Sequence, residues 1–87
     1  MPWMLLTPRE ADEVMRARAT HGSPSQRILT VLQHNLNPLT GDLDVTVEEL
    51  DQVRQAAGCW QCGGTKGLKA VLSAADRHGI GRENENF

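Results

Sequence analysis

Three four-residue segments of this chain carry the pattern that starts an α-helix, and they constrain its fold more than any other feature. Each has Ser or Thr in the first position and Glu or Gln in the fourth, so the hydroxyl can accept a hydrogen bond from the fourth backbone N–H while the longer side chain accepts one from the first. The segments are TPRE from Thr7, SPSQ from Ser23 and TVEE from Thr46. Three such starts in 87 residues favour a helical fold.

Apolar residues at helical spacing follow each of these starts, and a fourth segment shows the same spacing over 66–78. The apolar positions expected to face the core are Ala11, Val14, Met15 and Ala19; Ile28, Leu29, Leu32 and Leu36; Val47, Leu50, Val53 and Ala57; and Leu68, Val71, Leu72 and Ala75. Glycine adopts the left-handed conformation that ends helices, and proline cannot continue one. The expected helix ends are therefore Gly22, Asn37 with Pro38, Gly58 and Gly79. Ile80 stands where such an ending packs an apolar residue back onto the helix.

These patterns predict an all-α fold: a small single-domain bundle of about four helices over 1–80, followed by a mobile polar tail over 81–87. The chain has only two tryptophans, one phenylalanine and no tyrosine. Its core must therefore rest on aliphatic residues, which suit helices better than strands. The connection 36–45 is rich in turn residues. A short strand over 43–45 fits its pattern, but no partner strand is evident.

The formal net charge of −2 provides no general attraction to nucleic acids or anionic membranes. The apolar run at the N-terminus is short and has no basic leader, so it predicts neither a secretory signal nor a membrane span. We therefore expect an intracellular, cytoplasmic protein. In that compartment the two cysteines would stay reduced, and a CxxC pair is more often metal-binding or redox-active than structural.

The segment GCWQCGGTKG, residues 58–67, contains that CxxC pair and permits a zinc interpretation. CWQCGGTKG resembles one unit of the cysteine-rich repeats in DnaJ-type zinc modules, although that family has several units and this chain has one, with Lys66 before the final glycine. His78 is excluded as a ligand because the predicted helix before it would hold it roughly 20 Å away. The predicted metal ligands are Cys59 and Cys62 with His21, which an up-and-down bundle places at the same end. Alternatively, two cysteine pairs could meet across a homodimer.

The same segment allows three further interpretations. A dithiol next to a helix start and Lys66 is chemically plausible, but the βαβ pattern of thioredoxin-like proteins is missing. The GxxxxG spacing suggests a phosphate loop, but lysine comes two residues late and the preceding segment is helical, so ATP hydrolysis is rejected. Only anion binding at the helix start, aided by Lys66 and Lys69, survives. Finally, the segment can be a plain turn whose cysteines pack as small hydrophobes.

Acidic residues cluster around the start of the third predicted helix, at Asp42, Asp44, Glu48, Glu49 and Asp51. Carboxylates are favoured at helix N-termini, which explains most of this pattern. The cluster could also form an acidic strip that docks on a basic partner.

Together these observations predict a small non-enzymatic protein that binds a larger macromolecule as an adaptor or inhibitor, a regulatory class that includes virus- and mobile-element-encoded proteins. A protein partner is favoured over nucleic acid, and membrane binding is not expected. The predicted partner-binding residues are Trp60, Lys66 and Lys69 in the 58–67 loop, and Asp42, Asp44 and Glu48 at the acidic helix start. We expect no catalytic residues and no cofactor. The alternative is a zinc-binding domain that uses Cys59, Cys62 and His21 or a homodimer.

Overall fold

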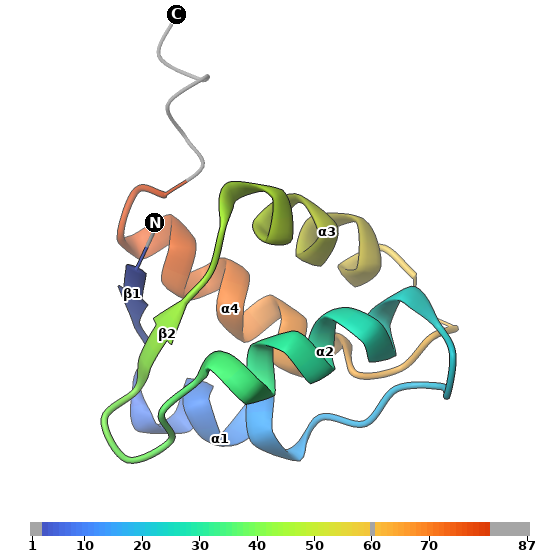
Figure 1. Ribbon diagram of the computed structural model, residues 1–87, viewed down its shortest axis with the longest axis horizontal. Coiled ribbons are helices and arrows are strands. Elements are labelled where there is room, and N and C mark those ends of the chain that lie inside the picture. Colours follow the sequence, from blue (N-terminus) through green and yellow to red (C-terminus); the bar gives the residue numbers. More distant parts are fainter. Residues whose placement is uncertain (1–2, 60, 81–87) are drawn as a thin grey trace, which may run out of the picture.

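The computed structural model describes residues 3–59 and 61–80, which form four α-helices and two short strands (Figure 1). In chain order these are β1 (Trp3–Leu5), α1 (Pro8–Arg16), α2 (Pro24–Asn35), β2 (Asp42–Asp44), α3 (Val47–Ala57) and α4 (Thr65–Arg77). The two strands lie side by side at one end of the molecule, and the loops that join α1 to α2 and α3 to α4 lie at the other (Figure 1). The predicted tail over 81–87 lies outside the described residues.

Two of the three predicted capping boxes are complete. At the start of α1, the Thr7 hydroxyl accepts from the Glu10 backbone N–H (3.1 Å) and the Glu10 carboxylate accepts from the Thr7 N–H (2.9 Å). Thr46 and Glu49 form the same pair of bonds at the start of α3, at 3.0 and 2.8 Å. These bonds satisfy backbone N–H groups that have no partner inside the helix, which is why the helices begin at these residues.

The third box is only half formed. Ser23 accepts from the Gln26 backbone N–H (3.1 Å), so α2 begins where predicted. The Gln26 side chain does not return a bond, however, and its Nε2 donates instead to the Thr30 hydroxyl one turn further along (3.1 Å).

The end of α4 follows the prediction in detail. Gly79 has a φ of 72°, in the left-handed region. Its N–H donates to the Asp76 carbonyl (3.1 Å), and the Ile80 N–H donates to the Ala75 carbonyl (2.9 Å). This pair of bonds defines a Schellman motif, and Ile80 packs against the core as expected.

The first helix is shorter than predicted, because α1 ends at Arg16 and does not continue to Gly22. Side chains take up the carbonyl groups at its end. The Arg18 guanidinium donates to the Ala17 carbonyl (2.9 Å), and Gln33 of α2 donates to the Val14 carbonyl (2.9 Å). Because these carbonyl groups have partners, the helix can end here, and Ala17 adopts an extended backbone conformation.

The fold is broadly helical but not purely all-α, which corrects the predicted class. The strand expected near 43–45 has a partner, because β1 and β2 pair antiparallel with Met4 opposite Leu43. The pairing continues in a bond from the Leu6 N–H to the Gly41 carbonyl (2.9 Å). Along 3–6 exposed and buried residues alternate, which is the period of a strand with one face on a core. The sequence does not reveal this alternation, because residues 3–6 are all apolar.

The sheet covers one end of a core that the helices build. Met4 and Leu43, the central residues of the two strands, are fully buried. They join an aliphatic cluster to which each helix contributes, for example Val14, Leu32, Leu50 and Leu68. The predicted core positions of the helices are largely confirmed, with the exception of Val47, which is 53% exposed at the first position of α3.

At Gly67, helix α4 packs directly against the backbone of α1. A Cβ atom added to Gly67 would lie 2.7 Å from Ala17 Cβ and 3.2 Å from the Glu13 carbonyl oxygen. These are backbone-bound atoms that cannot rotate away. The two helices would have to separate to accommodate any side chain at this position.

We therefore expect Gly67→Ala to destabilise the protein by about 1 to 2 kcal/mol, because the cost of overpacking exceeds the gain in helix propensity. Urea unfolding followed by circular dichroism measures this change. Ser73→Ala, at an exposed position of the same helix, is the matched control and should leave stability unchanged or slightly raised. A more stable Gly67→Ala variant would show that the helices do not pack this closely.

Candidate functional site

The outward face of the two-stranded sheet carries an apolar surface bordered by carboxylates. Trp3 and Leu5 point to the same side of β1 and are 48% and 42% exposed. Their cross-strand neighbours are Asp44 and Asp42, respectively. We call these four residues the ribbon face. The other large hydrophobic residues that are exposed in the described chain, Leu39 and Val47, flank β2 in sequence.

The Trp3 side chain is held in place by hydrogen bonds. Its indole Nε1 donates to Asp42 Oδ1 (3.2 Å), and Asp42 Oδ2 accepts from the Thr40 hydroxyl (2.8 Å). The indole also contacts the His78 ring edge-on, with 6.0 Å between the ring centroids. An aromatic side chain that is already fixed loses less conformational entropy on binding than a freely rotating one.

The outer edge of β1 is covered by the end of α4 at Leu5. His78 Nε2 lies 3.1 Å from the Leu5 N–H and 3.3 Å from the Leu5 carbonyl, so it accepts from the first or donates to the second according to its tautomer. The Leu5 carbonyl accepts from Arg77 Nη2 (3.0 Å). Unpaired strand edges invite pairing with other chains, and these bonds remove that possibility at Leu5. A partner would therefore meet the face of the ribbon and not its edge at this residue.

Arg77 connects this edge to α1 through a bidentate pair with Glu10. Its Nη1 and Nη2 lie 3.0 and 2.8 Å from Glu10 Oε2 and Oε1. The hydrogen bond from Arg77 is the main reason that the pKa of Glu10 is lowered, and the bonds from Thr7 act in the same direction against partial burial, which raises it. The same contact raises the pKa of Arg77.

The lowered pKa of Glu10 predicts a pH-dependent contribution to stability. This contribution is present above the ordinary pKa of 4.5 and is lost as the pH falls through the lowered value, because the unfolded chain then binds a proton more readily. Glu10→Gln keeps the capping box and removes the charge. Urea unfolding should show the variant less stable than wild type at pH 7, with a difference that shrinks towards pH 3. A difference that is constant with pH would contradict this role of the ion pair.

The predicted partner-binding residues fall into two groups at opposite ends of α3. Asp44 and Glu48 are exposed at the β2 end, and Asp42 is half-buried and bonded to Trp3. Lys66 and Lys69 are exposed on the first turns of α4, beyond the other end of α3. The eleven residues of α3 span about 16 Å, so these groups do not form one small contact. Trp60 lies outside the described residues.

Trp3 is not among the site residues predicted from the sequence. Residues 3–6 are all large and apolar, so the sequence shows no alternation there, whereas residues 42–45 on the opposite strand alternate acidic and apolar side chains. Recognising the first strand would have required pairing two segments about forty positions apart. The structure places Trp3 beside Asp42 and Asp44, two of the three acidic residues predicted to bind a partner.

The loops at the other end of the molecule meet as predicted. The Thr20 N–H donates to the Cys62 carbonyl (2.6 Å), and Ala19 forms an isolated β-bridge with Gly63. His21 follows directly and is exposed. Among the described residues, however, no group of three or more His, Cys, Asp or Glu side chains comes together to hold a metal.

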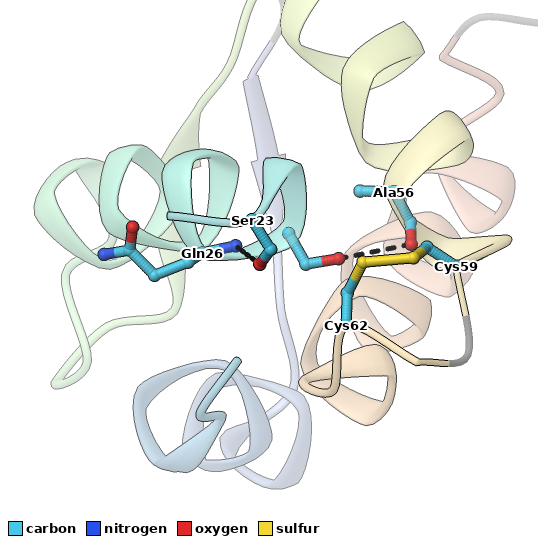
Figure 2. The surroundings of a disulfide bond; sticks show 6 residues. Ser23, Gln26, Ala56, Cys59 and Cys62 are labelled. Atoms are coloured by element: carbon cyan, nitrogen blue, oxygen red, sulfur yellow. Dashed lines mark hydrogen bonds between the residues drawn. A yellow bond between two sulfur atoms is a disulfide. The ribbon is translucent and has the colours of Figure 1, made fainter. Parts of the chain in front are cut away.

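Cys59 and Cys62 are joined by a disulfide bond, contrary to the expectation of reduced thiols (Figure 2). The turn between α3 and α4 holds their Cα atoms 5.5 Å apart, within the span of a disulfide. In this oxidised form neither sulfur is a thiolate, which is the form that binds zinc.

No helix in the described part of the chain has the length and apolar character needed to cross a membrane. In comparisons with known proteins, no family model, curated protein or solved structure matches this chain.

Proposed function

We propose that this chain is a non-enzymatic protein that binds a larger protein partner through the ribbon face and acts as an adaptor or inhibitor. The observation that carries the proposal is the half-exposed Trp3, fixed by Asp42 on a face where Leu5 is also exposed. Tryptophan is among the residues most enriched at the energetic centres of protein interfaces. A rigid aromatic side chain beside a second apolar side chain suits such a centre.

The charge around this centre favours a basic partner. Asp44 is exposed directly opposite Trp3, and Glu48 is exposed in the first turn of α3. Asp42 contributes differently, because both of its carboxylate oxygens are bonded within the chain and orient the indole. A Lys or Arg of the partner would pair with Asp44 at the rim and increase the rate and specificity of association. The Lys66 and Lys69 end is proposed as a second, separate contact.

Capture of the partner by purified variants tests this proposal. Trp3→Ala should weaken binding by about 30-fold, as expected for an interface centre worth about 2 kcal/mol. Asp44→Lys should slow association, and added salt should weaken its effect. Asp12→Lys makes the same charge change at an exposed position of α1, outside the acidic cluster, and should bind like wild type. Surface plasmon resonance gives the rates, and circular dichroism verifies that each variant is folded.

Trp60→Ala and Lys69→Glu belong in the same series because they test the other end of α3. Wild-type binding by both ribbon variants, together with loss of binding by these two, would place the contact at the 58–67 loop and refute the ribbon face. Wild-type binding by all four variants would refute both contacts.

A further inference from the structure

The disulfide lies at the end of the molecule opposite the ribbon face and borders a cavity. The cavity has a volume of about 480 Å³ and lies between α2 and α3. Arg27, Ile28 and Val31 line it from α2, Gln52 and Gln55 line it from α3, and Cys59 closes one end. This volume is within the range of sites that bind small molecules. Nothing in the proposed partner-binding function uses this cavity.

We propose that the Cys59–Cys62 disulfide exchanges with a small acidic peptide thiol, of the glutathione class, that binds in this cavity. The inference is independent of the ribbon face. In this reaction the CxxC pair is reduced by the small thiol or oxidised by the corresponding small disulfide, and each protein molecule reacts once.

The two sulfurs differ in access. Cys62 is buried, with 8% of its surface exposed, and its carbonyl is bonded to the Thr20 N–H. Cys59 is half-buried and forms part of the cavity wall. Because thiol–disulfide exchange depends on which sulfur can be reached, an incoming thiolate meets Cys59, and Cys62 is the leaving group.

The backbone holds the two cysteines together independently of the bond between their sulfurs. The Cys62 N–H donates to the Cys59 carbonyl (3.1 Å), and the Cys59 N–H donates to the Ala56 carbonyl (3.0 Å). Ala56 also accepts from the buried Ser25 hydroxyl of α2 (3.3 Å), which fixes α2 against the end of α3 beside the disulfide (Figure 2). The reduced thiols would therefore stay close enough to re-form the bond.

The disulfide adds little to the fold by itself. Its cysteines are three positions apart, and the chain entropy that a cross-link removes from the unfolded state decreases with loop length. A bond with a small structural contribution can open and close without unfolding the domain. This property suits an exchange reaction better than a permanent cross-link.

The cavity wall matches an acidic peptide in its chemistry. Arg27 makes no ion pair or side-chain hydrogen bond with the described residues, so its guanidinium is available for a carboxylate. Gln52 offers an amide to peptide groups, and Ile28 and Val31 provide apolar contact. A glutathione-class molecule combines carboxylates, amides and a thiol in a size that this volume accommodates.

The reaction balances in two steps. The thiolate of the first small thiol attacks Cys59 Sγ, a new S–S bond forms, and the Cys59–Cys62 bond breaks with its electron pair on Cys62 Sγ, which takes a proton from solvent. A second small thiol then attacks the mixed disulfide and releases Cys59 as a thiol. In total, one protein disulfide and two small thiols give one protein dithiol and one small-molecule disulfide.

Intact-mass spectrometry with glutathione disulfide tests which cysteine reacts. Cys62→Ser leaves Cys59 as the single thiol and should accumulate one glutathionyl group. Cys59→Ser leaves Cys62 and should react about tenfold more slowly because its sulfur is less accessible. Equal rates in the two folded variants would overturn the proposal. If either variant fails to fold, limited alkylation of reduced wild-type protein replaces it: labelling mainly at Cys59 supports the proposal, and equal labelling overturns it.

The second experiment tests the cavity and keeps both cysteines. Arg27→Ala should lower the rate at which reduced glutathione opens the disulfide by about threefold, as expected for an exposed charge pair. The uncharged thiol 2-mercaptoethanol is the control, and its rate should not change with this substitution. Equal effects on both thiols, or no effect on either, would show that Arg27 does not recognise the carboxylates and would overturn binding in the cavity.

Discussion

The antiparallel pairing of β1 with β2 decides both which side chains fill one end of the core and which are exposed on the ribbon face. Met4 and Leu43 face each other at the centre of the ribbon and are fully buried, so one surface of each strand belongs to the core. Because side chains alternate along a strand, Trp3 and Leu5 must then face outward. Burial of Met4 therefore leaves Trp3 and Leu5 exposed. The candidate binding surface and the packing of the core have the same origin.

Most of the helical structure could be predicted from the sequence because its signals are local. The capping boxes at Thr7 and Thr46 and the glycine at position 79 act over a few residues, so reading them requires no knowledge of the tertiary fold. The features that were missed depend on contacts between distant segments. The early end of α1 depends on a bond from Gln33 of α2, and the partner of the expected strand β2 is β1, which lies about forty positions earlier in the chain.

The difference between local signals and distant contacts also explains which residues of the candidate sites could be predicted from the sequence. The acidic residues and the CxxC pair were visible as clusters in the sequence, and the approach of the loop before α2 to the loop before α4 followed from a simple bundle topology. Trp3 could not be assigned, because its significance comes from Asp42, which lies 39 positions away. Asp42 was likewise predicted to be a carboxylate that binds a partner, whereas in the structure it accepts a hydrogen bond from the Trp3 indole and orients it. Only the tertiary structure distinguishes these two roles of one carboxylate.

Helix α4 connects the two ends of the molecule and is fixed near both. Near its start, Gly67 packs against α1 without room for a side chain, and at its end Arg77 and His78 hold Leu5 of β1. The disulfide lies before the first turn of this helix and is not part of these contacts. Neither the Gly67 contact nor the bonds to Leu5 involve a cysteine, so they do not require the disulfide to be closed. The ribbon face and the disulfide are therefore two separate proposed sites, at opposite ends of the same helix.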